Sequence, residues 1–315
     1  MPACKSAYRS RLAPSPTGRL HLGHARTALI AYLRALDQGG DLVLRIEDLD
    51  PLRSRVEFEA AIYEDLRWLG LSWAEGGDLG GAFGPYRQSE RIDRYEEAFQ
   101  RLVSMGAVYP CSCSRKDVAE AIANAPHGLA KTQAYPGTCR NGPKRSKGPM
   151  AYRFRMPERS PGFTDLFCGP IPEGKVPGDF VVRRADGLFS YQLAVVVDDA
   201  EMKITEVVRG EDLLDSTPRQ IALYRALSLP VPRFLHVPLV LGGDGVKLSK
   251  RHGGATLQSL RQKGWSRART LGWLADSLGL VPPPHIEGPS DLRPVFDLAS
   301  VDAAPFHLPG TPELL

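Results

Sequence analysis

Two histidines three residues apart are the first side chains whose types and spacing could do chemistry. His21 and His24 lie in the string PSPTGRLHLGH at residues 14–24, where a short extended segment turns into a helix. A helix N-terminus supplies backbone N–H groups and partial positive charge, and two such histidines can reach the same phosphates. Gly23 between them lets a ring or a ribose lie against the backbone. The full string predicts a triphosphate site, whereas HLGH alone would favour an ordinary turn before a surface helix.

A second cluster of cations follows far downstream, after a glycine-rich turn. Residues 247–251 read KLSKR, so Lys247, Lys250 and Arg251 place three positive charges within five residues. Such a loop suits a clamp on departing pyrophosphate. Taken alone it would more often be a solvated basic loop, and it gains weight only from its pairing with the first string.

Three of the five cysteines form a pattern that favours a metal. Cys111 and Cys113 are one residue apart, and Cys139 follows among prolines and glycines. Three thiolates suit zinc, which needs a fourth ligand in a closed structural site. His127 is the ordinary candidate for that ligand, and three buried free cysteines are the alternative to a metal. Cys4 and Cys168 have no partner pattern and are expected to be plain thiols.

The elements that must position these residues alternate at the start of the chain. Residues 11–14 read as a short extended piece, and apolar residues then recur at helical spacing over 25–36, up to Gly39. Residues 42–47 give a strand signal, and residues 56–69 repeat the helical period. This β-α-β-α order predicts an α/β fold with a parallel sheet and helices on its faces.

The rest of the chain follows the same rules, with one segment set apart. Residues 109–150 combine the three cysteines with several prolines, glycines and a basic run, which is typical of an insertion without a large core of its own. The apolar run at residues 193–197 fits either a strand or the core of a helix. Elsewhere the patterns predict a helix over 91–105, strands over 151–156, 180–184 and 204–209, a helix starting at Ser216, and helical structure over 256–278.

Composition excludes several classes of protein. The 315 residues are 43% hydrophobic and 24% charged with a net charge of +4, which permits a nucleic-acid partner without demanding one. No apolar run is long enough to span a bilayer and no secretory signal opens the chain, so a cytoplasmic location without a membrane partner is expected. The sequence contains no P-loop, dinucleotide fingerprint or HExxH motif, which removes common rival enzyme classes.

The histidine string at residues 14–24 and the lysine-rich string at residues 247–251 together resemble the paired signatures of class I aminoacyl-tRNA synthetases, usually written HIGH and KMSKS. Five strings in the family's order resemble its glutamyl branch: residues 11–18 (RLAPSPTG), 44–48 (LRIED), 208–213 (VRGEDL), 217–220 (TPRQ) and 247–251 (KLSKR). The resemblance implies a Rossmann-like class I catalytic domain with a zinc-binding insertion and a short helical C-terminal tail. It divides the chain into the first half of the catalytic domain (1–108), the insertion (109–150), the second half (151–255) and a stem-contact-like tail (256–315).

The length of the chain narrows the resemblance. Glutamyl-tRNA synthetases continue into helical anticodon-reading domains, whereas this sequence stops at Leu315, so that domain is expected to be absent. The short form resembles the glutamyl-queuosine tRNA(Asp) synthetases. This implies ATP-dependent, tRNA-independent activation of L-glutamate and its transfer to the queuosine base in the anticodon of tRNA(Asp). The alternatives are a short glutamyl-tRNA synthetase that charges a 3′ end, and a catalytically retired paralogue that binds only tRNA or amino acid.

The resemblance also assigns residues. Arg11 and Arg209 would hold the glutamate carboxylates, Glu47 the ammonium group, and Tyr191 one side of the pocket. The implied sets are, for glutamate, Arg11, Ala13, Ser15, Glu47, Tyr191 and Arg209; for ATP, with accompanying Mg²⁺, His21, Gly23, His24, Lys247, Ser249 and Lys250; for transition-state contacts, His21, His24 and Lys250; and for one structural Zn²⁺, Cys111, Cys113, Tyr135 and Cys139.

Overall fold

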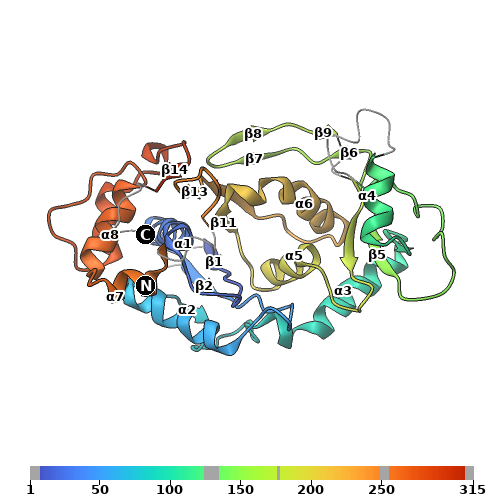
Figure 1. The fold of residues 1–315 in the computed structure, drawn as a ribbon, viewed down its shortest axis with the longest axis horizontal. Coiled ribbons are helices and arrows are strands. Elements are labelled where there is room, and N and C mark those ends of the chain that lie inside the picture. The colour runs from blue at the N-terminus through green and yellow to red at the C-terminus, as the bar shows by residue number, and fades with distance from the viewer. Residues whose placement is uncertain (1–7, 124–134, 176–177, 249–254, 309–315) are drawn as a thin grey trace, which may run out of the picture.

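A computed structural model describes residues 8–123, 135–175, 178–248 and 255–308. The molecule is elongated (Figure 1), with the N-terminal strands and the C-terminal helices toward one end and residues 108–123 and 135–160 toward the other. None of the helices in the described ranges is long and apolar enough to cross a membrane.

A parallel sheet forms the centre. Strands β1 (Arg9–Leu12), β2 (Asp41–Leu44) and β3 (Glu75–Gly76) pair in parallel in that order. On the other side of β1 lies β11 (Glu206–Gly210), which pairs in parallel with β12 (Arg233–Val237); the Thr205 N–H donates to the Arg9 carbonyl at 2.8 Å. The chain therefore leaves β1 toward one edge and later fills the other edge, which is the arrangement of a doubly wound fold.

Helices cover both faces of this sheet. One core joins α1 (Leu22–Asp37) and α2 (Val56–Trp68) to the C-terminal helices, and the other joins α3 (Ile92–Ser104), α5 (Tyr191–Glu201) and α6 (Thr217–Ala226). The α/β prediction is confirmed. The apolar run at 193–197 lies inside α5, and every one of its residues is buried, so its lack of a polar face left the helix and strand alternatives open.

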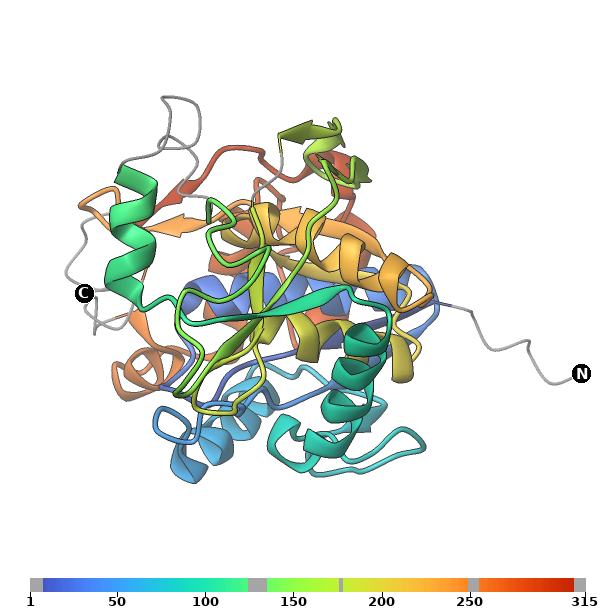
Figure 2. The ribbon, with the colours of Figure 1, turned by 90° about the vertical axis from the view of Figure 1, so that its right-hand side faces the viewer.

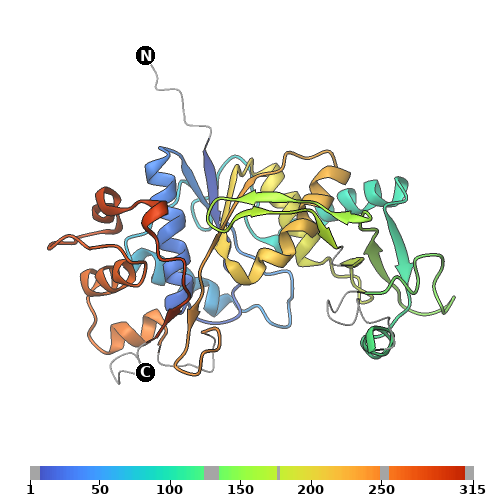
Figure 3. The same cartoon turned by 90° about the horizontal axis from the view of Figure 1, so that it is seen from above.

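The helical stretch predicted over 256–278 is two helices. Helix α7 (Leu257–Gln262) ends before Gly264, whose φ of 78° lies in the left-handed region that glycine tolerates. Helix α8 (Arg267–Asp276) starts after Ser266, whose side chain accepts the Arg269 N–H. Figures 1 and 3 show both helices beside α1.

The buried Arg26 ties the C-terminal helices to the central part of the fold. Its guanidinium, on α1, donates to the Pro238 carbonyl at 2.6 Å and to the Ser277 carbonyl at 2.9 Å. One side chain thus holds together the helix that starts at the histidine motif, the segment after β12, and the C-terminal end of α8.

The far end of the molecule, seen in Figure 2, carries an antiparallel sheet. Its order is β10 (Phe180–Arg183), β5 (Ala151–Phe154) and β4 (Val108–Cys111), and α4 (Arg115–Ala123) follows β4. The remaining elements are the strands β6 (Arg159–Ser160), β7 (Phe163–Asp165), β8 (Gly169–Ile171), β9 (Gly174–Lys175), β13 (Val240–Leu241) and β14 (Phe306–His307), and the short 3₁₀ helices Gln88–Glu90, Glu211–Ser216, Pro289–Val295 and Leu298–Ser300.

Candidate active site

The two histidines meet at the N-terminus of α1. His21 is the N-cap residue, and its ring stacks on the His24 ring with 3.7 Å between centroids. The His21 Nδ1 accepts the Gly23 N–H at 3.1 Å, and the His24 Nδ1 accepts the His21 N–H at 3.3 Å. Because each Nδ1 is an acceptor, the hydrogen of each neutral ring lies on Nε2, which makes Nε2 a donor. Donors at a helix N-terminus suit an anion such as a phosphate.

Gly23 has a local reason to be glycine. A Cβ built there would lie 3.1 Å from two atoms of the His21 ring, which is tighter than an ordinary contact. The sequence-based argument gave Gly23 the task of admitting a ligand ring or ribose. In the structure, the ring that lies against this backbone is that of His21 itself.

A second group of residues lies where β1, β2 and β11 end. Arg11 on β1 and Arg209 on β11 occupy neighbouring strands from which the chain continues to opposite edges of the sheet. Ligands of doubly wound folds bind at this switch point, outside the carboxyl ends of the strands. Glu47 follows β2 and its N–H donates to the Pro14 carbonyl at 3.1 Å, which brings it next to the loop that carries Ala13 and Ser15. The side chain of Ala13 is half-buried and that of Ser15 is exposed.

Arg11 is paired with an acid rather than with neutral groups. Its Nε donates to Asp199 Oδ1 at 3.2 Å, and its Nη1 donates to the Val208 carbonyl at 3.1 Å. The fully buried Arg45 donates to the same carboxylate at 2.7 Å and to Glu47 Oε1 at 3.0 Å. Although burial raises the pKa of Asp199, these two arginines outweigh it and hold that pKa below its ordinary value. Burial raises the pKa of Glu47 despite its arginine neighbours.

The same network continues away from the site. Asp198, next to Asp199 on α5, accepts from Arg91 Nε at 2.6 Å, from Gln88 at 2.8 Å and from the Tyr95 hydroxyl at 3.0 Å. Arg45 lies near this carboxylate too, with Nε 3.6 Å from Oδ2. The paired acids thus join α3, α5 and the central strands, and most of their charge is matched by arginine.

Arg209 has a different environment. It is 5% exposed, and among the described residues its guanidinium contacts only uncharged groups. Its short contacts are to His236 Nε2 at 2.9 Å, Gln220 Oε1 at 2.8 Å and Thr217 Oγ1 at 2.8 Å. The contacts to the Tyr191 hydroxyl and the Leu213 carbonyl are longer, at 3.5 and 3.4 Å. Burial lowers the pKa of Arg209, and no carboxylate pairs with it directly within the described ranges.

Tyr191 connects the two arginine environments. Burial raises the pKa of its hydroxyl, and the charges of Arg209, Glu47 and Arg11 all act on it. Four of the residues assigned to the glutamate pocket therefore do lie together: Arg11, Glu47, Tyr191 and Arg209. A buried cation without an acidic partner, beside a buried carboxylate, can receive an anion and a cation on one small molecule.

The downstream cationic string is described only in part. Lys247 is exposed and forms an ion pair with Asp212, which belongs to the VRGEDL string. The structure therefore gives Lys247 a carboxylate partner instead of leaving its ammonium for phosphate. Ser249 and Lys250 lie outside the described residues.

The three cysteines converge with Tyr135. The Sγ atoms of Cys111, Cys113 and Cys139 lie within 4.8 Å of one another. The Tyr135 hydroxyl lies 3.4 Å from the Cys111 sulfur and 3.5 Å from the Cys113 sulfur. Three sulfurs and one oxygen thus surround one point, and this donor set fits a four-coordinate metal such as zinc. His127 lies outside the described residues, as does Cys4.

The donors of this cluster differ in their surroundings, and their pKa values do not all shift in the same direction. Arg153 Nε donates to the Cys111 sulfur at 3.2 Å, and its guanidinium lies 3.7 Å above the Tyr135 ring. Burial raises the pKa of Cys139, but hydrogen bonds from the N–H groups of Lys144 and Ser112 and from Tyr135 bring it down to about 6. Burial raises the pKa of Cys113 to about 11, so the second thiolate needs a cation for its formation at neutral pH. Cys168 lies apart from the cluster, on the β7–β8 turn.

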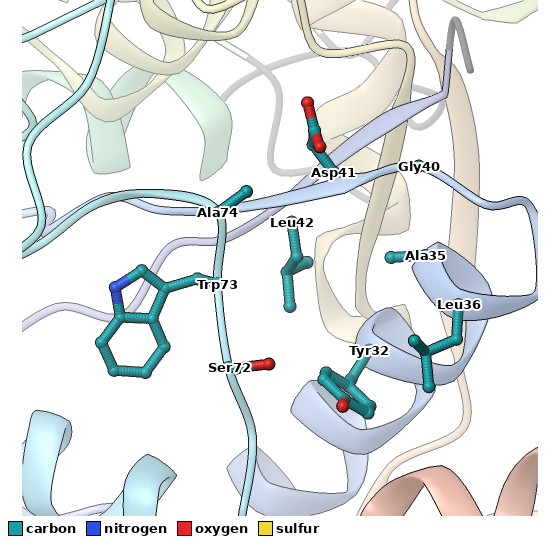
Figure 4. Close-up of a pocket in the computed structure, with 9 residues that line it drawn as sticks. All are labelled: Tyr32, Ala35, Leu36, Gly40, Asp41, Leu42, Ser72, Trp73 and Ala74. Atoms are coloured by element: carbon teal, nitrogen blue, oxygen red, sulfur yellow. The ribbon is translucent and has the colours of Figure 1, made fainter. Parts of the chain in front are cut away.

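A separate hollow of about 220 Å³ lies at the other end of α1. Figure 4 shows it between Tyr32, Leu36, Leu42 and Ser72, near the start of β2. Its one carboxylate, Asp41, is paired with Arg9 at 3.0 Å. The hollow is therefore remote from the histidine motif at the N-terminus of the helix, and it offers little chemistry.

Sequence reasoning quoted Arg45, Thr217 and Gln220 within the family strings without giving them a role, and it missed four more buried polar residues near Arg11 and Arg209: Asp165, Asp198, Asp199 and His236. Asp198 and Asp199 had a signal, since two acids directly after a long apolar run are expected to be buried and paired. His236, a single histidine inside the strand FLHV, had none beyond its place among apolar residues.

Comparison with known proteins agrees with this geometry. The family model of the catalytic domain of class I tRNA synthetases (E and Q) matches residues 7–281. The chain is 53% identical to the Glutamyl-Q tRNA(Asp) synthetase of Symbiobacterium thermophilum, with 95% of both chains covered, and 45% identical to that of Nitratidesulfovibrio vulgaris, with 96% of both covered. It is 42% identical to the Glutamate–tRNA ligase of Aquifex aeolicus, over 95% of this chain but 64% of that one.

Among solved structures, the chain is similar to a glutamate tRNA ligase from Elizabethkingia meningosepticum, crystallised in complex with its amino acid. The TM-score is 0.78 at 30% identity, covering 96% of this chain and 67% of that one. The family model covers most of the chain, and each of the two Glutamyl-Q tRNA(Asp) synthetases is covered to 95% or more. The chain is thus a ligase of the class I aminoacyl-tRNA synthetases for glutamate and glutamine, and within them it belongs to the Glutamyl-Q tRNA(Asp) synthetase family.

Proposed function

We propose that this enzyme activates L-glutamate with ATP in the absence of tRNA and then transfers it to the queuosine base in the anticodon of tRNA(Asp). The observation that carries the proposal is the buried Arg209 guanidinium, whose described partners are all neutral. Burying an unpaired charge is costly unless something compensates it. A substrate carboxylate would supply the missing negative charge.

The rest of the glutamate molecule has matching groups nearby. In the proposal, Glu47 takes the ammonium group and Tyr191 closes one side of the pocket with its hydroxyl. Arg11 is already bound to Asp199 at 3.2 Å, so it contributes a second positive charge to the pocket while staying in its ion pair. Ala13 and Ser15 line the entrance from the loop after β1.

Activation needs positioning and charge stabilisation more than acid–base catalysis. The glutamate carboxylate attacks the α-phosphorus of ATP in line, pyrophosphate leaves, and no covalent bond to the enzyme forms. His21 and His24, whose Nε2 atoms are donors, contact the phosphates at the N-terminus of α1, and Gly23 lets the His21 ring fold back. Lys247, Ser249 and Lys250 complete the phosphate site, which requires Lys247 to leave Asp212. Mg²⁺ enters with ATP as part of the substrate.

We also propose that Cys111, Cys113, Tyr135 and Cys139 hold one structural zinc ion. When bound, the metal cross-links β4 to the segment around Cys139, and with four protein ligands it has no position left for a reactive water. Elemental analysis of the purified protein should find about one zinc per chain, and Cys111→Ser should lower that content. Equal metal in both proteins would remove the site.

The two relatives that carry the name Glutamyl-Q tRNA(Asp) synthetase support the choice of acceptor. The test is incorporation of labelled glutamate into tRNA(Asp) with and without queuosine, each intact or lacking its terminal 3′ adenosine. Incorporation that requires queuosine and survives loss of the adenosine is expected. Incorporation only into intact tRNA(Glu) would make the enzyme a conventional glutamate–tRNA ligase, and no glutamate-dependent ATP–pyrophosphate exchange would favour a retired paralogue.

A further inference from the structure

Among the residues that the proposed function leaves unused, His236 contacts the Arg209 Nε and is itself held by Asp165. We propose that Asp165 and His236 are positioning residues that fix the Arg209 guanidinium for the substrate carboxylate by holding His236 in one tautomer. This inference rests on the proposed function, in which Arg209 binds glutamate.

The first link is a buried Asp–His pair. Both side chains are fully buried, and His236 Nδ1 lies 2.7 Å from Asp165 Oδ2. The other carboxylate oxygen, Oδ1, accepts the backbone N–H groups of Phe167 and Cys168 at 3.0 and 2.9 Å. Although burial raises the pKa of Asp165, these hydrogen bonds lower it overall, so the carboxylate is ionised and must accept the Nδ1 hydrogen.

The second link follows from the first. With its hydrogen on Nδ1, the neutral ring presents a lone pair at Nε2, and Arg209 Nε donates to this atom at 2.9 Å. The opposite tautomer would place two N–H groups against each other. The Phe234 ring lies nearly parallel to that of His236 with 6.2 Å between centroids, and it places apolar surface beside the contact between His236 and Arg209.

The His236 imidazole also lies between the Asp165 carboxylate and the Arg209 guanidinium, so that the acid does not pair with Arg209 directly. A carboxylate in the position of His236 would pair with Arg209 and neutralise the charge that the substrate needs, as Asp199 does for Arg45 and Arg11. A histidine held by an acid orients the guanidinium equally well but leaves its positive charge uncompensated. The two guanidinium nitrogens, Nη1 and Nη2, each retain one long contact, to Tyr191 and Leu213, which a carboxylate can replace.

The sharpest test is Asp165→Asn. The backbone N–H groups of Phe167 and Cys168 should keep the amide oxygen in place of Oδ1. The amide NH₂ then faces His236 Nδ1, which must become the acceptor, so the hydrogen moves to Nε2 and opposes Arg209. In glutamate-dependent ATP–pyrophosphate exchange we expect the KM for glutamate to rise at least tenfold, with kcat and the KM for ATP within about twofold of wild type. The ¹⁵N signals of His236 should report the exchanged tautomer.

Three comparisons separate positioning from a general loss of stability. Asp179→Asn alters another buried acid, which accepts the Tyr109 hydroxyl at 2.7 Å far from Arg209, and it should leave the KM for glutamate unchanged. His236→Gln, which can keep an acceptor for Arg209, should retain more glutamate affinity than His236→Leu. If Asp165→Asn does not fold, the comparison of these two variants tests the inference in its place. In an Arg209→Lys background, which lacks the Nε donor, Asp165→Asn should have no further effect.

An unchanged KM for glutamate in folded Asp165→Asn with the exchanged tautomer would overturn the inference. So would an equal effect of that substitution in the Arg209→Lys background, or equal affinities for the two His236 variants. The proposed function fails separately: it is wrong if Arg209→Gln leaves the KM for glutamate unchanged.

Discussion

Arg45 and Arg209 are both buried arginines at the ends of central strands, yet they are held in opposite ways. Arg45 is surrounded by Asp199, Glu47 and Asp198, whereas the described partners of Arg209 are a histidine, an amide, a hydroxyl group, a phenol and a carbonyl. A buried charge with acidic partners stabilises the fold it belongs to. A buried charge with neutral partners is costly unless something compensates it, which is why we propose that a substrate carboxylate binds Arg209.

The largest expected effect comes from removing the uncompensated charge. Arg209→Gln should lower kcat/KM for glutamate in ATP–pyrophosphate exchange by about 30-fold to a few thousand-fold, because losing a buried contact between a charge and a carboxylate costs about 2–5 kcal/mol and each tenfold corresponds to about 1.4 kcal/mol. The free energy of unfolding in urea should change by no more than about 1 kcal/mol, because the substrate is absent from that measurement. A strongly destabilised Arg209→Gln variant that retained its activity would mean that Arg209 serves stability and not glutamate binding.

Removing the charge of Arg45, which is compensated by acids, should instead lower the stability of the protein. Arg45→Met leaves Asp199 and Glu47 with fewer cationic partners, and breaking a buried ion network from one side costs about 3–5 kcal/mol of stability. Urea unfolding should show this as a lower midpoint. Arg45→Lys keeps the charge and serves as the matched control, with a smaller loss expected. An Arg45→Met variant as stable as wild type would mean that the acids around it do not need the arginine.

The smallest expected effect is a change of stability with pH that comes from His236, the neutral partner of Arg209. Burial lowers the pKa of His236 below its ordinary value of 6.5. Between the folded and unfolded pKa values the unfolded chain binds the proton and the folded chain does not. Stability should therefore fall as pH drops below about 6.5, by up to about 1.4 kcal/mol per pH unit, and should not depend on this group above that pH. Urea unfolding from pH 5 to 8 should show a steeper acid loss for wild type than for His236→Gln.

Local sequence patterns predicted most of the longer helices, but among the strands only β1, β2, β5, β10 and β11. Helix α2 ends one residue before its predicted limit and α3 lies within the predicted 91–105, because their apolar residues recur every three to four positions. The contacts between buried charged and polar side chains could not be predicted from such local patterns. Arg11 meets Asp199 across 188 positions of sequence, and no local pattern encodes which buried arginine meets an acid and which meets a histidine. The family strings named residues that lie close together in the structure, but they could not show that Arg45 is surrounded by acids and Arg209 by neutral groups.

Arg26 sets a lower limit on how far this enzyme can be shortened. Its guanidinium bonds to carbonyls from two distant segments, and one of these, Ser277, belongs to the C-terminal end of α8. Truncation before α8 would leave the buried Arg26 guanidinium without the Ser277 carbonyl and would uncover the apolar core that α1 shares with α8. Minimisation of the enzyme for engineering should therefore keep α8, since this helix completes the buried core that covers one face of the central sheet.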